Sequence, residues 1–198
     1  ESGIMKKMPS MTGYSRGAAI VINTAAILTY KPMPDWKFAK VEALFLFDSV
    51  DRSYDLQNSL TKYIPSNVEY AYHAMRDDSA HSRDSFGHCG TAMKGANTFF
   101  VPKKFYTTHG GMGGVLWGVK GVNPELESKR FVTSKAHGPS VSGAAEFNRR
   151  ELERIKNEPH IFETFPDGVT NVTVAQEKAG SEAVHRWMWP FLRKHGIL

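Results

Sequence analysis

Two segments in the first quarter of the chain carry the clearest hydrophobic patterns. Residues 16–29 are mostly small or aliphatic, with apolar positions at helical spacing, which predicts a largely buried helix. Pro32 and Pro34 follow, and we expect the helix to end there because proline cannot continue a helix and disfavours the α conformation before it. Residues 41–47, VEALFLF, form a nearly continuous apolar run, which is typical of a parallel strand buried on both faces.

The middle of the chain carries weaker patterns. Residues 68–75, VEYAYHAM, fit either a strand or a short helix. Residues 98–107 have the composition of a strand but are interrupted by Pro102, which indicates a strand preceded by a bulge or turn. Residues 110–114, GGMGG, predict an irregular loop.

Two helices are expected in the last third, an amphipathic one at residues 144–157 and a second at residues 181–194 that is anchored by aromatic side chains. Strands that alternate with helices favour an α/β fold with a mostly parallel sheet flanked by helices. The length of 198 residues suits one domain rather than two. We therefore expect a single domain over residues 1–198, in which residues 142–198 form a C-terminal helical segment.

Composition narrows the class of protein. Hydrophobic residues make up 41% and charged residues 23%, as in ordinary globular proteins. The net charge is +5, but Lys and Arg are spread along the chain, so we expect no nucleic-acid partner. A single cysteine excludes an internal disulfide and favours a cytoplasmic location, and no run reaches the ~20 apolar residues of a membrane span.

The sharpest chemical motif is GYSRG at residues 13–17, which matches G-x-S-x-G. In a nucleophile elbow, the serine occupies a strained strand-to-helix turn, so we predict a positive φ at Ser15. Glycine is expected at Gly13 and Gly17 because larger side chains would collide across the turn. The backbone N–H of Arg16 would donate to a developing oxyanion at the start of the helix. A serine in an ordinary glycine-rich turn is the alternative.

A serine becomes a strong nucleophile only when a base takes its proton and an acid orients that base. The expected base is His109, in a glycine-rich loop after a strand-like segment, although a histidine with only a structural hydrogen bond is the alternative. The expected acid is Asp48, because it directly follows the buried strand at 41–47 and lies at the carboxyl edge of the sheet. A turn or cap carboxylate is the alternative there. Three other carboxylates are rivals for the acid: Asp51, Asp77 and Asp78.

These segments resemble an α/β-hydrolase family of the GxSRGA type that includes phospholipase effectors of bacterial type VI secretion. The matching segments are GYSRGA at 13–18, FDSV at 47–50, AYHAMRDD at 71–78 and FYTTHGGMGG at 105–114. The resemblance covers roughly residues 5–120 and implies an ester hydrolase with Ser15 as nucleophile, Asp48 as acid and His109 as base. It implies lipid or phospholipid ester substrates, peripheral membrane contact and secretion as an effector, with no cofactor and no metal.

The chain departs from that family at its start. An α/β-hydrolase builds several strands before its elbow and takes a second oxyanion donor from an early loop, whereas twelve residues precede Gly13. We therefore expect a fold that is partial at its N-terminal side, in a fragment of a longer protein or one that takes strands from another chain. Self-association would follow from the exposed edge strand.

Two other function classes stay open. The fold could serve as a non-catalytic binding or assembly module. A metal or anion could instead bind the loop that carries three potential ligands, His81, His88 and Cys89, with several aspartates nearby, although their spacing matches no tight zinc pattern.

Overall fold

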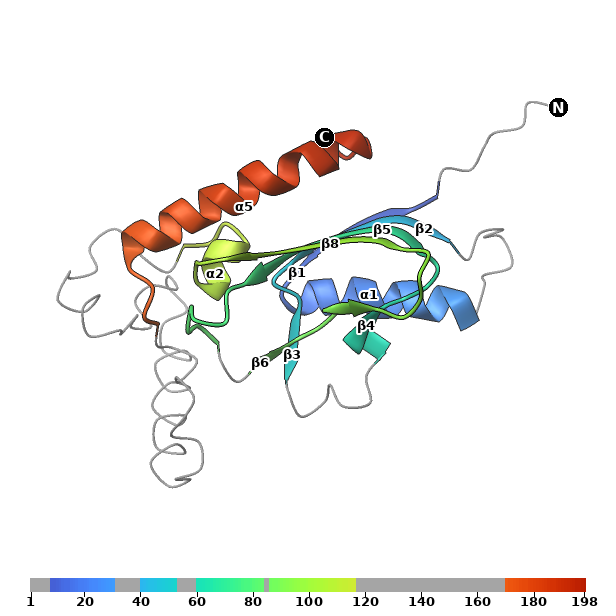
Figure 1. The fold of residues 1–198 in the computed structure, drawn as a ribbon, viewed down its shortest axis with the longest axis horizontal. Helices are drawn as coiled ribbons and strands as arrows, with labels where there is room; N and C mark the ends of the chain where they lie inside the picture. The colour runs from blue at the N-terminus through green and yellow to red at the C-terminus, as the bar shows by residue number, and fades with distance from the viewer. Residues whose placement is uncertain (1–7, 31–39, 53–59, 84–85, 117–169) are drawn as a thin grey trace, which may run out of the picture. The chain divides into compact units, whose positions relative to one another are not determined.

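The structure is a computed structural model that describes residues 8–30, 40–52, 60–83, 86–116 and 170–198. Its elements are, in chain order, β1 (Ser10–Tyr14), α1 (Arg16–Tyr30), β2 (Val41–Phe47), β3 (Val50–Arg52), the 3-10 helix η2 (Leu60–Lys62), β4 (Tyr63–Ile64), β5 (Val68–Arg76), β6 (Phe86–His88), β7 (Ala92–Met93), β8 (Phe99–Phe105), α2 (His109–Met112) and α5 (Val174–Lys194) (Figure 1). The chain divides into two compact units. The first comprises Glu1–Ala74, His88–Lys103 and Trp187–Leu198, and the second Met75–Gly87 and Lys104–Arg186.

A four-stranded sheet in the order β1-β2-β5-β8 organises the first unit. β1 pairs in parallel with β2, and β2 pairs in parallel with β5. The fold is therefore α/β, with a mostly parallel sheet flanked by helices. The register places Tyr14 opposite Phe47, so β1 and β2 end side by side.

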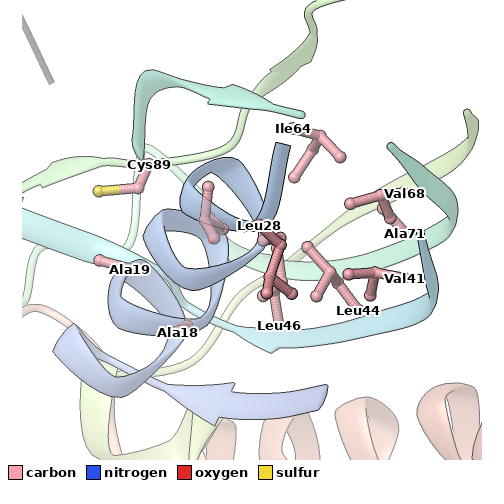
Figure 2. Packing of buried hydrophobic residues seen from close by; sticks show 12 residues of the cluster. Ala18, Ala19, Leu28, Val41, Leu44, Leu46, Ile64, Val68, Ala71 and Cys89 are labelled. Carbon is pink, nitrogen blue, oxygen red and sulfur yellow. The ribbon is translucent and has the colours of Figure 1, made fainter. Parts of the chain in front are cut away.

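Helix α1 covers one face of this sheet (Figure 2). Its small and aliphatic side chains Ala18, Ile22 and Ala25 are fully buried. They belong to one core cluster with Leu44 and Leu46 of β2. The helical spacing of apolar residues that predicted this helix is thus the spacing of its buried positions. Full burial of one such leucine contributes about 2 kcal/mol.

Aromatic side chains cover the other face of β2. Phe45 alternates with Leu44 and Leu46 along the strand and stacks on Tyr72 of β5, with ring centroids 5.5 Å apart. Tyr72 stacks in turn on Phe191 of α5, at 4.1 Å. The prediction that residues 41–47 form a strand buried on both faces is confirmed, with the same bounds.

Two ambiguous segments become strands in the structure. Residues 68–75 fall in β5, which is extended throughout. The strand predicted around residues 98–107 is β8, and it runs through Pro102 without interruption. β8 stands last in the sheet order. An edge strand tolerates proline, because the missing N–H need not reach a neighbouring strand.

The expectation of an irregular loop at residues 110–114 is partly wrong, because α2 turns through His109–Met112. Thr108 caps this turn, since its hydroxyl accepts a hydrogen bond from the Gly111 N–H at 2.9 Å. Helix α5 also begins seven residues before the predicted start at residue 181. Thr173 and Gln176 form a reciprocal capping box there, with Gln176 N–H to Thr173 Oγ1 at 3.3 Å and Thr173 N–H to Gln176 Oε1 at 3.0 Å.

The predicted helix at residues 144–157 lies outside the residues that the structure describes. Within the described ranges, no helix combines the length and the apolar character that crossing a bilayer requires.

Candidate active site

Ser15 occupies the turn between β1 and α1. Its φ is 58°, so the predicted positive φ at the strand-to-helix junction is confirmed. The Ser15 N–H donates to the Phe47 carbonyl at 3.0 Å, and the Ser15 carbonyl accepts from the Ala18 N–H at 3.1 Å. These bonds hold the serine between the end of the sheet and the first turn of α1. A left-handed conformation costs a non-glycine residue about 1–2 kcal/mol, which the surrounding structure supplies.

The two glycines of the motif differ in the space available for a side chain. A Cβ at Gly13 would lie 2.6 Å from both the Cα and the N of Ala18, so the close approach of β1 to α1 requires glycine there. A Cβ at Gly17 would meet nothing within 4 Å. The expectation that Gly17 is needed to avoid a collision is therefore wrong, because its missing side chain would point into open space.

Asp48 directly follows β2 at the same edge of the sheet. Tyr14 and Phe47 are opposite each other, so Ser15 and Asp48 follow paired positions on neighbouring strands. Asp48 is fully buried, has a φ of 41°, and donates its N–H to the Ala74 carbonyl at 2.8 Å. The structure thus brings the predicted nucleophile and the predicted acid to one end of the sheet.

The rival carboxylates have other surroundings. Asp51 is partly exposed, and one of its oxygens lies 4.0 Å from Nε of Arg16. Asp77 and Asp78 lie in the second unit. Two hydrogen bonds from Ser79 lower the pKa of Asp77, and Asp78 pairs with Lys104. Among these four aspartates, Asp48 is the one with a fully buried side chain beside the elbow.

His109 lies in the second unit, as the first residue of α2. It is 8% exposed, and its backbone N–H donates to the Ser82 hydroxyl at 2.9 Å. The preceding Thr107 and Thr108 both donate hydrogen bonds to Glu177, to its carbonyl and its carboxylate respectively. The turn that carries His109 is thus fixed to the start of α5, and the role of His109 as base stays a prediction.

A different histidine lies beside Asp48. His88 ends β6, and its Nδ1 is 3.4 Å from Asp48 Oδ1. The side chain is 24% exposed, but Nδ1 itself is buried and makes no hydrogen bond of good geometry, so the contact with Asp48 is electrostatic. The residue after it, Cys89, donates its N–H to the Ser49 carbonyl at 2.8 Å. Sequence reasoning considered His88 only as a metal ligand, because its proximity to Asp48 depends on a contact between segments 40 residues apart.

His73 of β5 supports the turn that carries Asp48. Its Nε2 accepts a hydrogen bond from the Ser49 N–H at 3.2 Å, and its Nδ1 lies 3.0 Å from the Gly90 carbonyl. Since Nε2 is the acceptor, Nδ1 carries the proton and donates it to Gly90. Complete burial lowers the pKa of His73 to about 4, against the opposing effects of the Gly90 carbonyl and Asp48. His73 is therefore a neutral, structural histidine at neutral pH.

The described residues hold no group of three or more His, Cys, Asp or Glu side chains arranged as a metal site. His81 lies in the second unit and Cys89 in the first, where burial raises the pKa of the Cys89 thiol to about 11. The structure gives the metal hypothesis no support.

Arg16 is the first residue of α1, directly after Ser15, with a largely exposed side chain. This is the position from which a nucleophile elbow presents a backbone N–H to the oxyanion.

No protein-family model matches the chain, and no curated protein matches it. The family implied by the resemblance therefore stays a prediction.

Proposed function

We propose that this protein is a serine hydrolase that cleaves ester bonds, with Ser15 as nucleophile, Asp48 as acid and His109 as base. The observation that carries the proposal is the left-handed Ser15 at the β1–α1 junction, next to a fully buried aspartate at the end of the neighbouring strand. Strained, non-glycine residues of this kind cluster at active sites, where the strain can be part of the mechanism.

Each group has a defined task in this proposal. The hydroxyl of Ser15 attacks the acyl carbonyl while His109 takes its proton, and His109 then returns that proton to the leaving alcohol. Asp48 orients the imidazole and stabilises the imidazolium. The Arg16 N–H stabilises the oxyanion of the tetrahedral intermediate. Water then hydrolyses the acyl-enzyme by the same steps.

The substrates that we propose are lipid or phospholipid esters, on the ground of the resemblance alone. A series of p-nitrophenyl esters with acyl chains of two to sixteen carbons tests this part separately. A maximum of kcat/KM at long chains supports lipid substrates, and a maximum at acetate contradicts them.

The decisive experiment is labelling with a fluorophosphonate probe, followed by mass spectrometry to locate the adduct. We expect the adduct on Ser15, and no labelling of Ser15→Ala. Asp48→Asn should lower kcat by on the order of 10⁴, because the imidazole loses its orientation, whereas Asp51→Asn should change it little. His109→Asn should abolish turnover. An adduct elsewhere, or full labelling of Ser15→Ala, would contradict the proposal.

A further inference from the structure

The Asp48–His88 contact is a feature of the site that the proposed triad does not use. Asp48 is fully buried, and a buried carboxylate is stable in its charged form only where donors or positive charge face it. His88 brings a ring nitrogen to 3.4 Å from Oδ1, and that nitrogen is itself buried and makes no hydrogen bond of good geometry. The imidazole therefore turns its Nδ1 edge toward the carboxylate.

Three other titratable groups near this turn have known partners or charge states. His73 donates its proton to the Gly90 carbonyl and accepts from the Ser49 N–H, so it has no N–H for Asp48. Arg16 faces Asp51. The Cys89 thiol is held neutral by burial and brings no charge. His88 brings a ring nitrogen to 3.4 Å from the Asp48 carboxylate, whereas His73 uses both of its ring nitrogens in other hydrogen bonds.

Backbone hydrogen bonds fix the segment that carries His88. The Cys89 N–H donates to the Ser49 carbonyl and the Gly90 N–H donates to the Thr61 carbonyl, both at 2.8 Å. His73 connects the same two turns, because it bonds to Ser49 on one side and to Gly90 on the other. Residues 88–90 are thus held against residues 48–49 independently of the His88 side chain.

We infer that His88 is a positioning residue for the acid of the triad: its buried Nδ1 lies 3.4 Å from Asp48 Oδ1, and a proton on that nitrogen attracts the oxygen and holds the carboxylate in one orientation. This inference rests on the proposed function. His88 acts through Asp48 and exchanges no proton with the substrate. Its loss should therefore lower kcat and leave KM nearly unchanged, because substrate binding does not involve it.

The test compares two variants of the full chain. In His88→Asn, the side-chain amide places an N–H close to the former Nδ1, whereas His88→Leu places no donor there. We expect His88→Leu to lower kcat by about 10- to 100-fold with KM within about twofold, and His88→Asn to retain most of the activity. The exposed His185→Asn is the matched control and should leave both parameters unchanged.

Spectra of ¹⁵N-histidine-labelled protein give a readout other than activity. We expect the His88 signal of the wild type to report a protonated Nδ1, and this signal to move in Asp48→Asn while the His185 signal stays in place. Equal losses in His88→Asn and His88→Leu would overturn a role through the N–H. Losses as deep as that of Ser15→Ala, together with an active His109→Asn, would make His88 the base and overturn its role as a positioning residue.

The two proposals fail in different ways. If Ser15→Ala is inactive and unlabelled while His88→Leu is fully active, the inference about His88 is wrong and the hydrolase stands. If Ser15→Ala still turns over the ester, the proposed function itself is wrong.

Discussion

His195 Nδ1 lies 2.9 Å from Glu42 Oε1, which joins two residues 153 positions apart within the first unit. The other ring nitrogen, Nε2, lies 3.1 Å from the hydroxyl of Tyr72. Glu42 also accepts a hydrogen bond from the Ser10 hydroxyl at 3.2 Å through its second carboxylate oxygen. This partly buried chain of polar contacts attaches the end of α5 to three neighbouring strands, β1, β2 and β5.

We predict a strong energetic coupling between Glu42 and His195. The His195 side chain is 3% exposed and that of Glu42 20%, so solvent screens the pair only partly. A double-mutant cycle with Glu42→Gln and His195→Asn should give a coupling free energy of about 1–3 kcal/mol in urea unfolding. Additive losses would mean that the contact contributes nothing beyond the burial of each side chain.

We predict that His73 makes stability fall in mild acid. Its pKa is about 4 when folded and about 6.5 when unfolded, so the unfolded chain binds the extra proton between these values. The neutral, buried His73 therefore makes its full contribution to the free energy of unfolding above about pH 6.5. This contribution is lost as the pH falls toward 4. Between pH 7.5 and pH 5 the loss should be about 2 kcal/mol.

Urea unfolding at the two pH values measures this effect. His73→Gln should be less stable at pH 7.5, but it should lose about 2 kcal/mol less than the wild type on going to pH 5. The exposed His185→Gln serves as the control and should retain the slope of the wild type. If the free energy of unfolding of His73→Gln fell with pH as much as that of the wild type, other groups would be the cause of the acid sensitivity.

We predict that alanine substitutions at Gly13 and Gly17 change the stability of the protein in opposite directions. Gly13→Ala places a Cβ 2.6 Å from backbone atoms of Ala18, and it should cost about 2–3 kcal/mol or more because backbone must move. Gly17→Ala meets nothing, and inside α1 it should be neutral or stabilise by up to about 1 kcal/mol. Thermal melting of both variants tests this prediction. Similar losses of stability in Gly13→Ala and Gly17→Ala would contradict the close contact at Gly13.

The left-handed conformation of Ser15 predicts that glycine at this position makes the protein more stable than alanine does. Ser15→Gly and Ser15→Ala both remove the hydroxyl and should both be inactive. Glycine adopts a φ of 58° without a steric penalty, so Ser15→Gly should be about 1 kcal/mol more stable than Ser15→Ala. Equal stabilities in urea unfolding would show that the serine turn is not strained.

The elbow and β2 were predictable because their signals are local. Gly13 and Ser15 specify a tight turn by themselves, and the run at 41–47 is long enough to identify a strand buried on both faces. The capping box of Thr173 and Gln176 was equally readable, and it would have moved the start of α5 to the correct residue. The contact of His88 with Asp48 was not predictable, because nothing in the three residues of β6 indicates which segment they lie against.

The two proposed catalytic residues of the first unit directly follow their strands, and both have a backbone φ in the left-handed region. The value is 58° for Ser15 and 41° for Asp48. Such conformations persist only while the packed core beneath them holds the strand ends and α1 in place. On heating, or when a cavity is opened by Ile22→Ala, these turns should relax before the helices melt. Esterase activity should therefore disappear at a lower temperature than the helical circular dichroism signal, so that inactivation precedes unfolding.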